Sequence, residues 1–208
     1  MPNAARAALA IAIASYAGFG APALADTFCA TPAQTKTITD FLAANPGTLP
    51  PVAAARLDLP EATVVSALGA DAAASAPGPD FAAIWAKLGE FSELTFLVMK
   101  GPNVFEIRSK AGRGTPSKTS RYFNIEYSQP LRGHLRPDLY ASVYALKLTA
   151  KNPGQAAPRG ILVYDASGAS VFGAFIGGDG PPPTTADLAT FDALFELVRS
   201  KTPVCPRE

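Results

Sequence analysis

Side chains that bind metals through nitrogen or sulfur, or that support redox chemistry, are scarce in this chain. Its 208 residues include one histidine, two cysteines, two methionines and one tryptophan. The sequence has no Cys-x-x-Cys-His motif, no glycine-rich phosphate loop, and no Ser-His-Asp or Cys-His arrangement that would use the single histidine. Acid and base chemistry by two carboxylates stays open, although nothing distinguishes one pair among the glutamates. We therefore expect a binding or interaction protein and not an enzyme.

A strong charge of one sign is also missing. The formal net charge is +1, and removal of the N-terminal leader described below takes away Arg6 and leaves a formal charge of zero. Non-specific binding to nucleic acid needs a strongly basic surface. The charge balance therefore argues against a nucleic-acid-binding protein.

A long hydrophobic run occurs only near the N-terminus. Arg6 precedes an apolar run from Ala7 to Ala17, and Ala23-Leu24-Ala25 has the small residues of a signal-peptide cleavage site. The run is shorter than the roughly 20 residues of a membrane-spanning helix. We predict a cleaved signal peptide over residues 1–25, a mature start at Asp26, and export to the periplasm without stable membrane insertion.

The two cysteines lie near the ends of the predicted mature chain, at Cys29 and Cys205. In an oxidising compartment such a pair favours a disulfide between the two ends, with two free thiols as the alternative. A loop this long would add about 4 to 5 kcal/mol of stability in the chain-entropy description. Residues 26–208 are long enough for one domain with its own core.

The first part of this predicted domain, residues 36–88, has a helical period. We expect helices from Lys36, over Val52–Leu57 and Glu61–Leu68, and over 81–88. The two short middle helices have helix-turn-helix spacing, but the second lacks the basic and amide side chains that read DNA, so we interpret them as a packing unit. Ala70–Pro79 is interpreted as a linker of small residues.

Residues 93–179 change to a period of two, which is typical of β-strands. Runs of β-branched and aromatic residues alternate with turns that contain glycine or proline. Short connections imply antiparallel hairpins in one meandering sheet, and Lys110–Ser120 is expected to be a loop. The expected strands are Leu94–Lys100, Asn103–Arg108, Arg121–Tyr127, Leu139–Thr149, Gly160–Asp165 and Ala169–Ile176.

Residues 185–200 are expected to form a last helix, with Asp187 in its first turn. One stripe of this helix is apolar and should cover a face of the sheet. The predicted fold class is therefore α+β, with N-terminal helices packed on a large antiparallel β-sheet and a C-terminal helix. The stripe consists of Leu188, Phe191, Leu194, Phe195 and Val198.

The single histidine lies in the segment Leu131-Arg132-Gly133-His134-Leu135-Arg136. Gly133 adds no side-chain bulk beside the imidazole, and Arg132 and Arg136 place fixed positive charge on both sides. Such a group suits an iron porphyrin, because the iron takes a nitrogen ligand and the propionates take cations. From these residues alone, a turn or packing role for His134 is the alternative.

Residues 81–179 resemble the ChuX/HutX-type haem-utilisation carriers. The helical part from about Phe41 to Leu68 fits the same family more loosely. The matching pieces follow the family's order: Ala83-Ile84-Trp85, Leu97-Val98, Tyr122-Phe123-Asn124-Ile125, Arg132-Gly133-His134-Leu135, and Tyr164–Phe172 continuing into Phe175–Asp179.

The resemblance implies N-terminal helices packed on a large, saddle-like antiparallel sheet, usually in a homodimer. It also implies that haem is bound non-covalently and passed to another protein without turnover. The binding histidine of the family falls on His134, and its second histidine, at the end of the first strand, falls on Met99. A thioether can ligate haem iron, although a methionine at a strand end is by default a core residue.

Two further positions depart from the family pattern. The family's lysine in the last strand and its arginine after the terminal glycine are replaced by Gly173 and Gly178. These losses, together with Met99, favour an alternative function in which the scaffold is an interaction module that has lost the haem site.

We predict a periplasmic haem-binding protein that buffers or relays haem, with a haem donor or acceptor protein as partner. His134 is the predicted iron ligand and Met99 the second. Alternation along the strand puts Tyr122 and Phe123 on opposite sides, so only one of the two can pack on the porphyrin face. Phe105 is a further candidate for packing on the porphyrin face. The candidates for contact with the propionates are Arg132, Arg136, Arg121 and Lys100.

Overall fold

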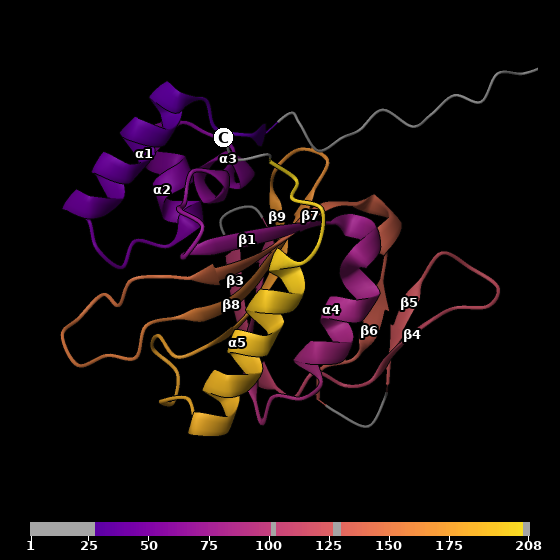
Figure 1. The fold of residues 1–208 in the computed structure, drawn as a ribbon. Helices are drawn as coiled ribbons and strands as arrows, with labels where there is room; N and C mark the ends of the chain where they lie inside the picture. The colour runs from indigo at the N-terminus through magenta and orange to yellow at the C-terminus, as the bar shows by residue number, and fades with distance from the viewer. Residues whose placement is uncertain (1–27, 101–102, 127–129, 206–208) are drawn as a thin grey trace, which may run out of the picture.

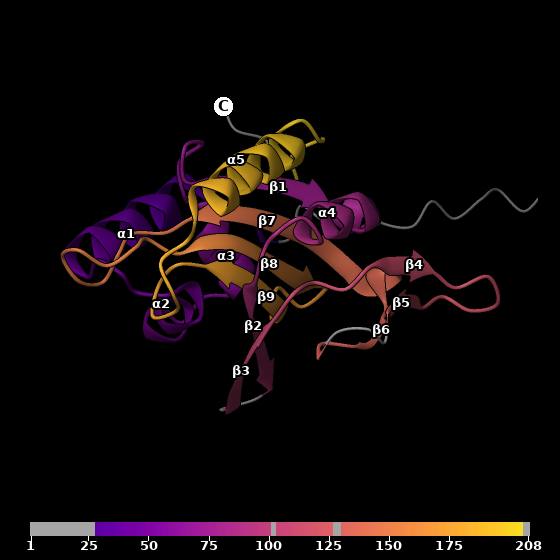
Figure 2. The same cartoon turned by 90° about the horizontal axis from the view of Figure 1, so that it is seen from below.

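A larger antiparallel sheet with helices on both faces and a smaller antiparallel sheet make up the described part of the chain (Figures 1 and 2). The computed structural model describes residues 28–100, 103–126 and 130–205. The predicted signal peptide and the mature start at Asp26 lie outside these residues. The helices are α1 (Pro32–Ala44), α2 (Pro50–Leu57), α3 (Glu61–Ser66), α4 (Phe81–Leu88), α5 (Thr185–Arg199) and the 3-10 turns η2 (Gly78–Asp80) and η3 (Pro137–Leu139).

The larger sheet has six strands in the order β1-β7-β8-β9-β2-β3, and every neighbouring pair is antiparallel. A separate sheet has three strands in the order β4-β5-β6. The antiparallel pairing and the α+β class are as predicted. The strands are β1 (Ala73–Pro77), β2 (Leu94–Lys100), β3 (Asn103–Ser109), β4 (Gly114–Pro116), β5 (Phe123–Ile125), β6 (Gly133–Leu135), β7 (Tyr140–Lys147), β8 (Arg159–Asp165) and β9 (Ser170–Ile176).

Helix α1 begins at Pro32 and not at Lys36 as expected. The side chain of Thr31 accepts from the backbone N–H of Gln34, and the Gln34 side chain accepts from the backbone N–H of Thr31. This capping box satisfies two backbone donors that would otherwise lack partners, so the helix extends toward the N-terminus. Proline at the first position adds no donor that needs a partner.

The interpretation of Ala70–Pro79 as a linker is wrong for its middle part, Ala73–Pro77, which forms β1. Strand β1 pairs with β7, and Ala73 lies opposite Leu146. Its alanines are buried, and α5 packs on it. Small side chains give little strand signal by themselves, and the pairing partner lies far along the sequence, so no local pattern indicates this strand.

The expectation of one meandering sheet is also wrong. The middle of the run predicted over Arg121–Tyr127 forms β5, with Tyr127 outside the described residues, and β5 pairs with β4 and β6 and not with the larger sheet. Strand β4 lies inside the segment expected to be a loop. Alternation indicates a strand but not which sheet it joins, so β5 was expected in the larger sheet, and β4 and β6 were not expected as strands.

Helices α4 and α5 lie on one face of the larger sheet (Figure 2), and the small sheet lies beside α4 (Figure 1). The helix predicted over 81–88 is confirmed as α4, and its side chains Phe81, Ile84, Trp85 and Leu88 are buried. The Phe123 ring joins the small sheet to this helix, with its centroid 5.5 Å from that of Phe81 and 6.1 Å from that of Trp85. The small sheet is thereby fixed on the main core.

The opposite face of the larger sheet packs against α3. Ala62 and Val65 of this helix share a core cluster with Tyr144, Leu162 and Tyr164 of the sheet.

The predicted disulfide is confirmed, with the Cα atoms of Cys29 and Cys205 5.5 Å apart. Within the residues that the structure describes, no helix is both long enough and apolar enough to span a membrane.

Candidate functional site

The predicted iron ligand, His134, lies in the middle of β6 on the solvent side of the small sheet. Cross-strand register places it opposite Asn124 of β5, while Phe123 lies opposite Leu135. Phe123 and Ile125 are buried, so alternation turns Asn124 and His134 to the other face. His134 is exposed and therefore accessible to a ligand from solvent.

His134 is held by two neighbours. Its Nδ1 atom is 2.7 Å from Oδ1 of Asn124, which is a hydrogen-bond distance. The ring of Tyr122 lies edge-on to the imidazole, with centroids 5.8 Å apart and the ring planes at 64°. The imidazole orientation is therefore set by a polar contact on one side and an aromatic contact on another.

Arg136 completes this surface next to Tyr122. Its guanidinium carbon lies 5.6 Å from the centre of the Tyr122 ring, within the range of a cation–π contact. Arg136 donates two hydrogen bonds of 2.7 Å to Asp138, and Arg121 approaches the same carboxylate at 3.7 Å. The hydrogen bonds from Arg136 lower the pKa of Asp138, which is therefore ionised near neutral pH.

The structure brings five of the predicted site residues to this end of the molecule. Arg132 is exposed one residue before β6, and alternation gives it the same side as His134 and Arg136. Phe123 lies in the core, so Tyr122 is the aromatic residue available on the outer face. The five residues are Arg121, Tyr122, Arg132, His134 and Arg136. We call their shared surface the His134 face.

Three other candidates lie on the larger sheet. Met99 is half-buried in β2, and the Ser170 hydroxyl lies 4.0 Å from its sulfur. Lys100 ends the same strand, and its side chain lies outside the described residues. Phe105 of β3 is 57% exposed. Met99 and His134 thus belong to different sheets, and the contacts described for each involve different neighbours.

Position 133 has room for a side chain, so neighbouring atoms do not require a glycine there. A Cβ added there would meet no atom of the described residues within 4 Å. Gly114 of β4 differs, since an added Cβ would lie 2.0 Å from the Phe123 ring and 2.7 Å from Trp85. The glycine that the core requires is therefore the one on β4 and not the one beside His134.

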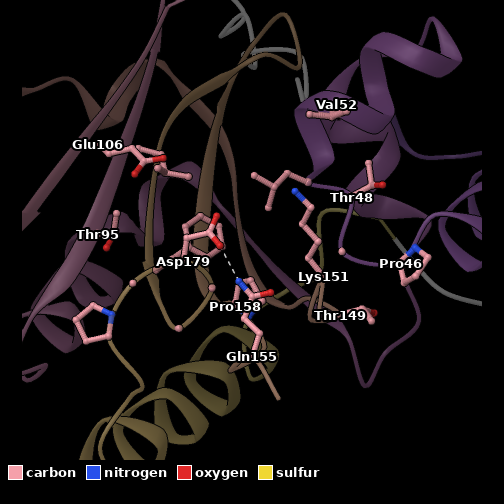
Figure 3. A pocket seen from close by; sticks show the side chains of 18 of the residues that line it. Pro46, Thr48, Val52, Thr95, Glu106, Thr149, Lys151, Gln155, Pro158 and Asp179 are labelled. Atoms are coloured by element: carbon pink, nitrogen blue, oxygen red, sulfur yellow. Dashed lines mark hydrogen bonds between the residues drawn. The ribbon is translucent and has the colours of Figure 1, made fainter. Parts of the chain in front are cut away.

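A cavity of about 680 Å³ lies on the face of the larger sheet that carries Leu97 and Phe175 (Figure 3). Lys151 reaches into it, and Gln155 donates a 2.7 Å hydrogen bond to Asp179 at its edge. Among the side chains that the structure describes, none of those predicted to bind iron or propionates lines it. It is bounded by residues 46–49 and Val52 on the helical side and by residues of β2, β3 and the segment 177–181 on the sheet side.

The two glycine departures lie at or near this cavity. A Cβ at Gly173 would lie 2.6 Å from the Phe175 ring and 2.8 Å from Leu162. Gly178 lines the cavity and has a φ of +67°, a conformation that side chains other than glycine rarely adopt. The surrounding residues therefore fit glycine at both positions, and a lysine or arginine there would require rearrangement.

Asn124 and Asp138 were not predicted as site residues, although both contact predicted site residues. Asn124 belongs to the piece Tyr122-Phe123-Asn124-Ile125, and the period of two places it on the same side as Tyr122. Asp138 follows Arg136 by two residues. These signals were present, but the pairing of β5 with β6 was needed to connect Asn124 with His134.

The fold is shared with solved structures that include haem-binding proteins. A protein from Erwinia carotovora is 24% identical over 77% of this chain and 98% of its own, with a TM-score of 0.68. The haem-binding protein ChuX is 19% identical over 78% of this chain and 99% of its own, with a TM-score of 0.66. Residues 74–194, more than half of the chain, match the haem utilisation ChuX/HutX family. The chain belongs to this family.

Longer proteins share the fold as well. PhuS from Pseudomonas aeruginosa, a haem-binding protein, is 23% identical with a TM-score of 0.65 over 86% of this chain. The match covers 49% of PhuS, so this chain spans about half of its length. The haem-degrading enzyme ChuS of Escherichia coli O157:H7 is 19% identical with a TM-score of 0.63. At these identities the likeness concerns the fold alone. None of the curated proteins matches this chain.

Proposed function

We propose that the protein binds haem through His134 and buffers or relays it in the periplasm without degrading it. The observation that carries the proposal is the exposed imidazole of His134, held at Nδ1 by Asn124. Haem supplies four nitrogen ligands to its own iron, so one protein imidazole is enough for attachment. Haem is the cargo in this proposal and not a resident cofactor.

The chemistry of the His134 face fits this cargo. Arg132 and Arg136 flank the imidazole, and guanidinium groups match the geometry of carboxylates such as the propionates. Asp138 already binds Arg136 and approaches Arg121, which fixes the Arg136 guanidinium and offsets part of the positive charge. Tyr122 offers an aromatic ring that is 44% exposed beside the imidazole.

We extend the proposal to a homodimer. Strand β3 is an edge of the larger sheet, and six of its seven residues are exposed, including Val104, Phe105 and Ile107. Adjacent residues of a strand point to opposite faces, so β3 exposes apolar side chains on both. Exposed apolar edges of this kind mark contact with another chain. A second copy would cover an apolar strand that one chain leaves in water.

A second candidate function is an interaction module that has kept the scaffold without the haem site. Gly173 and Gly178 favour it, because a side chain at Gly173 would overlap Phe175 and Leu162, and one at Gly178 would require a backbone conformation that residues other than glycine rarely adopt. The exposed β3 would then serve a different protein partner. Haem binding separates the two functions, since the interaction module needs none.

The test loads the protein with hemin and measures intact haem by the pyridine haemochrome assay during incubation with ascorbate and oxygen. A carrier should keep its haem intact, while His134→Ala, checked for folding by circular dichroism, should lose it on gel filtration. Loss of the Soret band with formation of an open tetrapyrrole would contradict the carrier role and indicate a degrading enzyme. Equal retention by His134→Ala would contradict the proposed ligand.

A further inference from the structure

We propose that Asn124 is a positioning residue for His134. Its amide oxygen holds the imidazole in the form with a proton on Nδ1, which leaves the lone pair of Nε2 for a metal. The distance of 2.7 Å between Nδ1 of His134 and Oδ1 of Asn124 carries this inference. The identity of the metal rests on the proposed function, whereas the tautomer itself does not.

The sheet fixes the position of Asn124. It lies on β5, the central strand of the three, between Thr115 of β4 and His134 of β6. Its neighbours Phe123 and Ile125 are each 4% exposed and are packed in the main core. The backbone of Asn124 therefore has little freedom to move away from His134, and the contact is a built part of the sheet.

The direction of the hydrogen bond decides the tautomer. A neutral imidazole has one N–H donor and one unprotonated nitrogen, and a carboxamide oxygen can only accept. Nδ1 of His134 must therefore donate to Asn124, and Nε2 carries the lone pair. The opposite tautomer would put a proton on Nε2 and block ligation through that atom until the proton was lost.

The contact should also affect a bound metal. A hydrogen bond from the remote N–H of a ligating histidine fixes the ring and raises its basicity, and loss of such a partner commonly weakens metal affinity by about 10- to 100-fold. The edge-on contact with Tyr122 restricts the same ring from another side. Asn124 thus acts through His134 and does not itself touch the cargo.

The first test needs no haem. Long-range proton–nitrogen NMR spectra of the unloaded protein at alkaline pH, where imidazoles are neutral, report which ring nitrogen of His134 carries the proton. The wild type should show the Nδ1–H form, and Asn124→Leu should shift toward the Nε2–H form that free histidine prefers. Thr115→Val, on the other side of Asn124, is the matched control and should behave as wild type. An unchanged tautomer in Asn124→Leu would overturn the proposal.

The second test uses the hemin-loaded ferrous protein and resonance Raman spectroscopy of the iron–histidine stretch. Asn124→Asp places a charged acceptor at Nδ1–H and should raise the stretching frequency, while Asn124→Leu should lower it and weaken hemin affinity about tenfold. A merely structural residue would not shift the two variants in opposite directions, so shifts of the same sign would overturn the role. Absence of hemin binding by the wild type would instead contradict the proposed function and leave the tautomer result standing.

Discussion

Cys29 and Cys205 form a disulfide across 176 positions of sequence, next to the Tyr144 hydroxyl, which lies 3.6 Å from the Cys205 sulfur. The bond joins the segment before α1 to the segment after α5. Helix α3 packs on one face of the larger sheet, and α5 covers the other face (Figure 1). The disulfide therefore joins the N-terminal helical part of the chain to the segment that follows α5.

Replacement of both cysteines by alanine should lower the free energy of unfolding by about 2 to 5 kcal/mol, because the unfolded chain regains the freedom of a long loop. Urea denaturation followed by circular dichroism measures the change. Dithiothreitol should destabilise the wild type to a similar extent and leave the double variant unaffected. Equal stability of the wild type and the double variant would contradict a structural role for the bond.

Gly114→Ala should destabilise the protein by about 1 to 3 kcal/mol, because the new methyl group overlaps the Phe123 ring. Gly133→Ala is the matched control on the same sheet and should change stability by less than about 1 kcal/mol. Thermal unfolding compares the two. A larger loss for Gly133→Ala would show that the residue beside His134 is more crowded than the structure indicates.

Asp187 should make stability depend on acid pH. Burial alone would raise its pKa, but hydrogen bonds from Thr184 and Ser92 outweigh burial and lower it. A carboxyl group with a lowered pKa in the folded state stabilises above its unfolded pKa of about 3.9, and that contribution is lost as pH falls through the folded value. Asp187 is the third helical residue and forms a capping box with Thr184, so Asp187→Asn should lose about 1 to 2 kcal/mol at neutral pH.

The stability difference between the wild type and Asp187→Asn should shrink as the pH falls below about 4. Denaturation curves at several pH values measure it. Asp192 lies on the same helix and is more exposed, so Asp192→Asn is the comparison variant and should show a smaller effect. A constant difference at all pH values would contradict the role of the ionised Asp187.

Phe105→Glu should weaken the proposed homodimer by at least about tenfold, because it places a charge on the exposed apolar edge strand. Light scattering after gel filtration measures the mass as a function of concentration. Val52→Glu changes an exposed valine on α2 and should leave the mass unchanged. A wild type that stays monomeric at its highest soluble concentration would contradict the proposed homodimer.

The elements that the sequence predicts best are those whose burial follows a local period. Helix α4 spans the predicted residues 81–88, and in α5 four of the five expected stripe residues are buried while Leu188 is partly buried. Strand β1 was missed, because alanines in a small-residue segment show no alternation, and its partner is β7. Pairing between distant strands is a property of the fold and not of either segment.

The candidate site was predicted as a set of residues but not as a geometry. Tyr122 and Phe123 were equivalent in sequence, and only the packing of Phe123 on α4 decides that Tyr122 faces outward. The sequence does not show that Met99 and His134, the two candidate iron ligands, belong to separate sheets. The register between β5 and β6 is needed to bring Asn124 to His134.

The measurement that tests the central proposal most directly is a hemin titration of the wild type, His134→Ala and Met99→Ala, followed at the Soret band. We predict saturable one-to-one binding by the wild type, loss of that binding in His134→Ala, and retention of it in Met99→Ala. A shift of the Soret band in Met99→Ala relative to the wild type would show that the thioether reaches the iron. Saturable binding that is the same with and without His134 would contradict the account.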